Sequence, residues 1–209
     1  MLQMTDHATE ISAAADAGRR FVAEFLHNRQ SEPKLCEPAP SEAELRSILP
    51  AVCRSPDHGN LKPYRFIVLT GEAQKQLGTL FLKAETQDAG EAGLKEGKAE
   101  KILGKPLRAP MIIVGVARLD EQHKVPVIEQ WLAAGCAVQT LSLLLENSGY
   151  GVMWRSGSFA YSEIVRQGLG LADNEQICAF LYCGTVEQHK QNRPALPSED
   201  TLISFCDQL

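Results

Sequence analysis

The sequence predicts one domain of the α+β class. Two apolar runs of strand length, YRFIVL and MIIVGVA, are rich in aromatic and β-branched residues. A third run carries no charge between Glu129 and Glu146 and has the length of a buried helix. No proline- or glycine-rich linker divides the 209 residues, so we expect a single domain over residues 1–209.

Composition is that of a globular protein and excludes several classes of partner. Hydrophobic residues make up 44% of the chain and charged residues 22%, which is enough to build a core. The net charge of −5 and the scattered Lys and Arg residues argue against a nucleic-acid partner. The polar N-terminus lacks the apolar run of a secretory signal, and six cysteines without a CxxC pair suit free thiols in the cytoplasm.

The first part of the chain alternates helices with polar loops. Apolar spacing predicts an amphipathic helix from Ile11 to His27 whose apolar side needs a partner surface. Prolines make NRQSEPKLCEPAP an extended connection suited to a ligand loop. Ser41 and Glu44 form a capping box for a helix through Cys53, which Pro50 should kink or end early, and the loop RSPDHGNLKP follows.

Strands and charged segments form the middle of the chain. Tyr64–Leu69 and Met111–Ala117 are expected to be buried strands, the second of them central. Between them, residues 72–105 are charge-rich and are interrupted by Gly78, Gly90, Gly93 and Gly97, so we expect broken helices that cover the site. Such covers often move.

A long buried helix dominates the last part. Ile128 to about Ser148 contains small residues for close packing, and its interrupting polar residues argue against a membrane span, which needs ~20 apolar residues. We expect the following elements after it: a strand at Gly151–Arg155, a helix near Tyr161–Leu169, a strand at Ile177–Cys183 and an extended tail after Pro194. Cys178 and Cys183 should lie on opposite faces of their strand, which prevents a mutual disulfide.

Three loops beside these elements carry groups suited to an anion. They are Arg29-Gln30-Ser31, the segment from Arg54 to Lys62, and Trp154-Arg155-Ser156-Gly157. Guanidinium and hydroxyl groups are the donors that a phosphate prefers, although an Arg next to a Ser is more often simply solvated. The sequence contains no GxGxxG after a strand, no P-loop, no HExxH and no Cys/His cluster for a metal.

Segments of the chain resemble the signature segments of the nitroreductase family, in the same order. They are RQSEPKLCEPAP, RSPDHGNLKPYRF and GYGVMWRSG, and HKVP, AGCAV and FLYCGT further match its small NAD(P)H nitroreductase branch. The resemblance covers about residues 24–190. It implies a nitroreductase-like fold with a central mixed β-sheet surrounded by helices. It also implies a homodimer whose C-terminal arm, Asn192–Pro197, wraps the neighbour.

The resemblance further implies a flavin mononucleotide (FMN) site at the subunit interface. The residues carried over are Arg29, Gln30, Ser31, Arg54, His58, Asn60, Trp154, Arg155, Ser156 and Lys190. Gln30 departs from the family's Arg-Arg-Ser motif and removes one positive charge. His58 and Asn60 would approach the flavin of the partner subunit, and Arg54 would approach the flavin of its own subunit. Without the motif, His58 is better explained as a turn cap, and Trp154 contributes through its backbone only.

The implied activity is ping-pong hydride transfer. NADH or NADPH would reduce FMN and leave, and a small-molecule electron acceptor such as a nitro compound or a quinone would then enter the same pocket. No catalytic side chain is assigned, because the cofactor carries the chemistry, and Arg29 or Arg54 is the candidate cation beside the reduced ring. Two alternatives stay open: a flavoenzyme with another acceptor, such as a dehydrogenase or dehalogenase, and a non-enzymatic flavin-binding protein.

Overall fold

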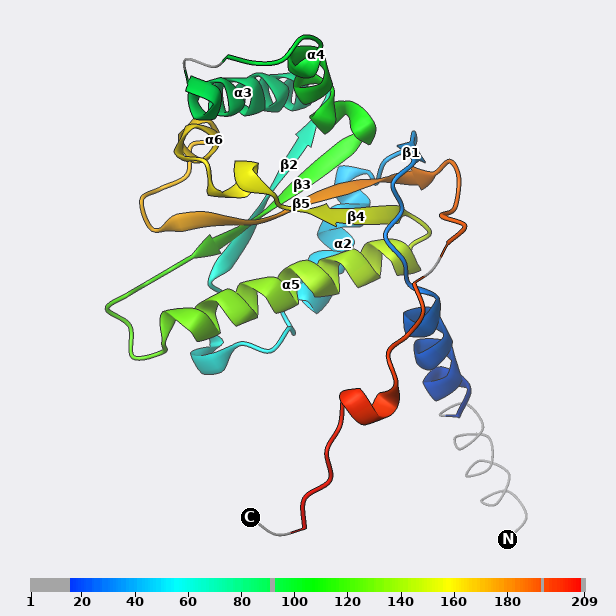
Figure 1. Ribbon diagram of the computed structural model, residues 1–209. Coiled ribbons are helices and arrows are strands. Elements are labelled where there is room, and N and C mark those ends of the chain that lie inside the picture. The colour runs from blue at the N-terminus through cyan, green and yellow to red at the C-terminus, as the bar shows by residue number, and fades with distance from the viewer. Residues whose placement is uncertain (1–15, 91–92, 193, 208–209) are drawn as a thin grey trace, which may run out of the picture.

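A five-stranded sheet forms the centre of the computed structural model, which describes residues 16–90, 93–192 and 194–207 (Figure 1). The long strand β5 (Glu175–Val186) pairs with β3 (Met111–Arg118), which pairs with β2 (Tyr64–Thr70). On its other side β5 pairs with β4 (Gly151–Arg155) and β1 (Leu35–Cys36). All of these pairings are antiparallel. The expected mixed sheet is therefore wrong for the single chain.

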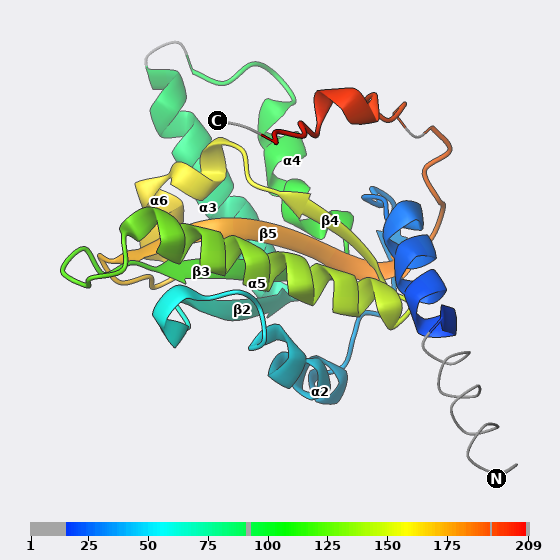
Figure 2. The same ribbon diagram turned by 90° about the horizontal axis from the view of Figure 1, so that it is seen from below.

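Helices cover both faces of the sheet. On one face lie α2 (Glu42–Val52) and α5 (Val127–Asn147), and on the other lie α3 (Glu72–Ala89), α4 (Lys98–Leu103) and α6 (Glu163–Gly168) (Figures 1 and 2). Short 3₁₀ turns occur at His58–Asn60, Lys105–Arg108, Ser158–Tyr161 and Glu199–Thr201. Each face has its own hydrophobic core, so the expected α+β class is confirmed.

Strand alternation divides the apolar side chains between the two cores. In β3, Ile112 and Val114 pack toward α3, whereas Ile113 packs toward α5. In β5 a bulge interrupts the alternation, because Ala179 and Ile177 oppose consecutive residues of β3 and Cys178 is extra. Cys178 therefore packs against the same core as Cys183, which corrects the expectation of opposite faces, and both thiols are free.

The helix α2 begins as expected and ends one residue before the expected Cys53. Ser41 and Glu44 form the predicted capping box, with the Glu44 carboxylate accepting from the Ser41 N–H at 2.8 Å. Pro50 lies inside the helix, which ends at Val52. Because Pro50 is close to the C-terminal end, it removes only one hydrogen bond of the helix and does not end it early.

The segment 72–105 is more regular than the glycine pattern predicted. α3 is one continuous helix of 18 residues, and its Leu77 and Phe81 belong to the core rather than to a cover. Gly78 does not break α3, because it serves close packing: a Cβ there would lie 2.5 Å from the backbone oxygen of Leu103. The helical pattern is interrupted only after Ala89.

The helix α5 is the predicted spine. By length and composition it could cross a membrane, yet residues such as Ala134, Val138 and Leu141 are buried against the sheet as in a soluble core. Its outer face exposes Ile128 and Leu132.

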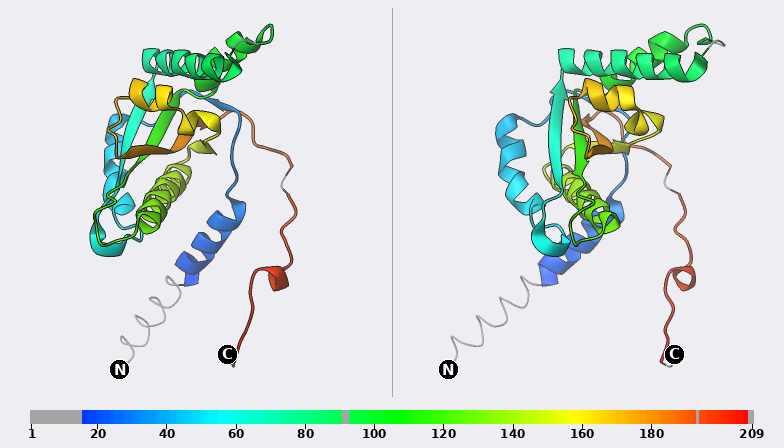
Figure 3. Two further views of the ribbon diagram at one scale, coloured as in Figure 1. Left: turned by 60° about the vertical axis from the view of Figure 1, so that its left-hand side comes forward. Right: turned by 90° about the vertical axis from the view of Figure 1, so that its left-hand side faces the viewer.

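Two terminal segments leave the domain at the end that holds β1 and the C-terminal end of α5 (Figures 1 and 3). The described part of the N-terminal helix covers residues 16–28 and exposes Phe21, Val22 and Leu26, while residues 11–15 lie outside the described residues. The tail after Pro194 is extended as predicted and leaves Phe205 89% exposed. In the part of the chain that the structure describes, these apolar side chains remain exposed.

Candidate functional site

The first and third predicted loops lie at the two ends of β4. The N–H of Glu32, next to Ser31, donates to the Val152 carbonyl at 3.1 Å and fixes the first loop beside the start of this strand. Trp154, Arg155 and Ser156 form the strand's other end and the loop that follows. Because a strand rises about 3.3 Å per residue, β4 separates the two loops by roughly 15 Å.

A cavity of about 360 Å³ opens at the first loop. Arg29, Gln30, Glu32, Glu146 and His189 are among the residues that line it. Arg29 lies 4.0 Å from the Glu146 carboxylate, and its side chain is still 36% exposed. Burial raises the pKa of Glu146, and the Arg29 charge opposes that effect.

The buried Glu32 carboxylate joins this loop to the segment after β5. It accepts hydrogen bonds from the Gln30 amide at 2.8 Å, from His189 Nδ1 at 2.8 Å and from the Lys190 backbone N–H at 3.1 Å. Burial alone would raise the pKa of Glu32, but these three hydrogen bonds outweigh it and hold the pKa below its ordinary value. The predicted residues 29–31 and Lys190 are thus brought together.

A second cavity, of about 380 Å³, lies at the other end of β4 and has a cationic lining. Arg155 there meets Lys105 and Arg108 of the turn before β3, and aromatic rings complete the wall. The Lys105 ammonium lies 4.5 Å from the centre of the Phe159 ring, and the Arg155 guanidinium 5.4 Å from that of Tyr182. Among the described residues, no carboxylate lines this cavity.

Two features of this cationic cavity point to an anionic or electron-rich ligand. Arg155 Nε is buried without a hydrogen-bond partner, which a folded protein seldom leaves uncompensated. Burial lowers the pKa of Lys105, and the charges of Arg108, Lys98 and Arg155 lower it further, although Glu85 opposes them. Sequence reasoning missed Lys105 and Arg108, since only the pairing of distant strands brings them to Arg155.

The second predicted loop lies on the opposite face of the sheet. His58 Nδ1 contacts the Glu129 carboxylate, and Ser55 donates to or accepts from the Thr140 hydroxyl at 2.8 Å, so the loop follows α5. Arg54 and Asn60 are exposed. The structure therefore does not bring Arg54, His58 and Asn60 to the cationic cavity within one chain, because the sheet lies between them.

Left-handed backbone shapes the tip of this second loop. Gly59, Asn60 and Lys62 have φ values of 74°, 56° and 51°. The buried Asp57 carboxylate accepts the Lys62 N–H at 2.7 Å and stabilises that conformation.

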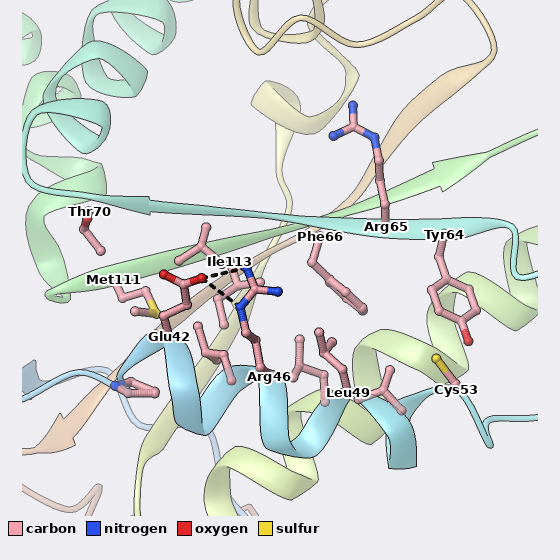
Figure 4. A pocket seen from close by; sticks show the side chains of 15 residues that line it. Glu42, Arg46, Leu49, Cys53, Tyr64, Arg65, Phe66, Thr70, Met111 and Ile113 are labelled. Atoms are coloured by element: carbon pink, nitrogen blue, oxygen red, sulfur yellow. Dashed lines mark hydrogen bonds and ion pairs between the residues drawn. The ribbon is translucent and has the colours of Figure 1, made fainter.

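A larger cavity, of about 760 Å³, lies elsewhere, between α2 and β2. Its walls are mainly apolar, with Leu49, Phe66 and Met111 pointing into it, and a Glu42–Arg46 ion pair of 2.6 Å at its rim (Figure 4). None of the ten predicted residues lines it. Size alone would favour this groove, but its two arginines, Arg46 and Arg65, are already paired with the carboxylates of Glu42 and Glu175.

Comparison with known proteins identifies the family of the chain. Residues 28–185 match the Nitroreductase family. The chain belongs to the nitroreductase family. Within the family it is 36% identical over 182 residues to the "Putative NAD(P)H nitroreductase YdjA" of Escherichia coli (strain K12), covering 87% of this chain and 97% of that protein. A similarly named protein of Haemophilus influenzae is 39% identical over 163 residues, covering 77% of this chain and 86% of the relative.

Solved structures of nitroreductase-family proteins share the fold. A nitroreductase-like family protein from Bacillus cereus superposes with a TM-score of 0.73 at 20% identity, over 90% of this chain and 96% of the other. The FMN and NADPH-dependent nitroreductase NfnB from sphigopyxis sp. strain HMH gives a TM-score of 0.67 at 21% identity, over 88% and 98%. These matches confirm the predicted nitroreductase-like fold.

Proposed function

We propose that this nitroreductase-family protein is a cytoplasmic, FMN-dependent NAD(P)H oxidoreductase that acts on nitro compounds or quinones. The observation that carries the proposal is the cationic cavity at the end of β4, whose Arg155 Nε is buried and unpartnered. The similarity to a putative NAD(P)H nitroreductase and to the FMN and NADPH-dependent nitroreductase NfnB supports the same activity for this chain.

The residues present fit a phosphorylated planar ring. At the start of β4, Arg29 lines the cavity, and Ser31 and Lys190 are the sequence neighbours of two other lining residues, Glu32 and His189. Together they offer a guanidinium, a hydroxyl and an ammonium group for the phosphate. The Gln30 side chain is uncharged, and its amide donates a hydrogen bond to the Glu32 carboxylate. At the other end, Arg155 and the Trp154–Ser156 backbone would hold the ring.

The cofactor would supply the redox chemistry, and the side chains would supply the charges around it. When bound, FMN accepts a hydride from NADH or NADPH and passes two electrons to the acceptor. Lys105 and Arg155 hold positive charge in a partly buried cavity, where it acts more strongly than in water. Lys105 therefore takes the role of cation beside the ring that Arg29 or Arg54 was expected to have.

A homodimer completes the site in this proposal. Arg54, His58 and Asn60 lie behind the sheet in their own chain, so they reach a flavin only if a second copy supplies them. Two exposed apolar side chains on α5 suit such an interface, because Ile128 and Leu132 are 65% and 61% exposed. Obligate interfaces usually bury more than about 2,000 Å².

Steady-state kinetics test the activity. We expect the FMN-loaded protein to oxidise NADH or NADPH faster when a nitroaromatic compound or a quinone is added. Initial rates at varied concentrations of both substrates should give parallel double-reciprocal lines, as a ping-pong mechanism requires. If neither acceptor accelerates oxidation although FMN is reduced, a dehydrogenase or dehalogenase with another acceptor is the better assignment.

A further inference from the structure

The candidate phosphate end of the site contains a feature that the proposed function leaves unexplained. Glu32 is a buried carboxylate, 5% exposed, in a cavity that is proposed to hold a phosphate. A negative charge at this place repels a phosphate and costs free energy on burial unless it is hydrogen bonded. Glu32 therefore needs a role other than direct contact with the ligand.

The contacts of Glu32 supply that role. One carboxylate oxygen accepts a hydrogen bond from His189 Nδ1, and the other accepts one from the Lys190 backbone N–H. Glu32 therefore binds two consecutive residues of one loop. The Glu32 backbone N–H is itself fixed to Val152 of β4. The loop after β5 is therefore tied through a single side chain to the strand along which the proposed site runs.

The loop has one further anchor. The Glu187 N–H donates to the Lys34 carbonyl at 3.1 Å, and the Lys34 ammonium contacts the Gln188 side chain. These contacts are exposed, whereas the Glu32 carboxylate is buried. A buried hydrogen-bonded carboxylate fixes its donors more firmly than exposed contacts do. Lys190 thus depends on Glu32 for its position.

We propose that Glu32 is a positioning residue that holds the 189–190 loop so that the Lys190 ammonium, and with it His189, binds the phosphate of FMN. This inference rests on the proposed FMN site and adds a residue to it. It predicts that Glu32 acts only on ligands that carry the phosphate. Riboflavin, which has the same ring without the phosphate, is the natural reference ligand.

The test measures dissociation constants of FMN and riboflavin with the full-length apoprotein, by quenching of flavin fluorescence. We expect Glu32→Ala to weaken FMN binding about tenfold, equivalent to about 1.4 kcal/mol, and riboflavin binding less than about twofold. Glu32→Gln keeps the size of the side chain and should give a smaller loss of the same kind. Glu187→Gln removes a charge from the same loop without a side-chain contact and should change neither constant.

A double-mutant cycle separates positioning from general damage. If Glu32 acts through Lys190, Glu32→Ala should weaken FMN binding much less in a Lys190→Gln background than in the wild type. Equal weakening of FMN and riboflavin, unchanged FMN binding, or additive effects of the two substitutions would each overturn the role of Glu32. Failure of the wild type to bind either flavin would instead overturn the proposed function.

Discussion

At the scale of single residues, the proposed function rests on the placement of charges in the cationic cavity. Lys105 is held over the Phe159 ring among like charges, and burial lowers its pKa. Among the described residues that line the cavity, no carboxylate neutralises the Lys105 ammonium. Its charge is thus available to a bound ring.

Replacing Lys105 by Gln should change the redox potential of bound FMN. A positive charge favours the more negative, reduced state, so we expect the midpoint potential to fall by about 30 mV, equivalent to about 1.4 kcal/mol for two electrons. Spectroscopic titration against a dye of known potential measures it. Lys75→Gln is the control, because Lys75 pairs with Glu72 and does not line the cavity. An unchanged or higher potential in Lys105→Gln would remove Lys105 from the site.

Residue patterns in the sequence predicted part of this chemistry. Ser31, Arg155 and their neighbours were recognised because their motifs are contiguous in the sequence. Lys105 and Glu32 could not be found in that way, since their partners Arg155 and His189 are 50 and 157 residues away. Such contacts exist only after the strands pair.

At the scale of elements, one ion-pair network joins three strands. Glu175 at the start of β5 accepts from Arg65 of β2 at 2.6 and 2.7 Å and from Arg118 of β3 at 2.9 Å. The hydrogen bond from Arg65, opposed by burial and helped by Arg118, lowers the pKa of Glu175 from 4.5 to about 2.

This network should make stability depend on pH in the acid range. Because the folded-state pKa of Glu175 is depressed, its contribution is complete above pH 4.5 and is lost as the pH falls toward about 2. Glu175→Gln should lower the free energy of unfolding by about 2 kcal/mol at pH 7, at the low end for buried pairs because Arg118 is half exposed. Urea unfolding should show this difference shrinking near pH 2.5, whereas Glu72→Gln should have little effect at either pH.

Packing of α3 against α4 gives a second prediction at this scale. Gly78→Ala places a Cβ 2.5 Å from the Leu103 backbone oxygen, so the helices must move apart. We expect a loss of about 2 kcal/mol in the free energy of unfolding, as overpacking usually costs. In the matched control Gly104→Ala, the nearest atom is at 3.4 Å and the backbone is helical. Equal melting temperatures for the two variants would contradict the close approach.

Elements were predictable where pattern and packing agreed. β2, β3 and β4 and the helix α5 fall at the expected places, because each is marked by an uninterrupted apolar run or by flanking turn residues. The glycines of 72–105 misled the prediction, since Gly78 reflects a tertiary contact. The bulge at Cys178 depends on the register with β3 and leaves no local signal.

At the scale of the whole molecule, the apolar surface left by one chain supports assembly. Ile128 and Leu132 on α5, Phe21 and Leu26 in helix 16–28, and Phe205 in the tail are all exposed. Exposed apolar patches of this kind mark interaction sites in soluble proteins. The sequence predicted a dimer from the apolar spine helix and from family resemblance, but not which side chains are exposed, because exposure is known only once the fold is known.

Introducing a charge on this surface should break the assembly. We expect Leu132→Glu to shift the protein from dimer to monomer at micromolar concentration and to weaken FMN binding, because a charge in an apolar interface stays desolvated. Light scattering after size-exclusion chromatography and fluorescence titration measure the two effects. Tyr161→Glu, at an 81% exposed residue outside α5, should leave both unchanged. A Leu132→Glu monomer that binds FMN as tightly as the wild type would exclude an intersubunit site.

The proposed activity requires that the chain binds FMN and that NAD(P)H reduces the bound FMN. The most direct test is the visible absorbance spectrum of the purified, FMN-loaded protein, recorded without oxygen before and after NADH or NADPH is added. We expect the yellow flavin bands to bleach with one of the two coenzymes. Bands that persist with both, or a protein that retains no FMN after loading and gel filtration, would contradict the proposed activity.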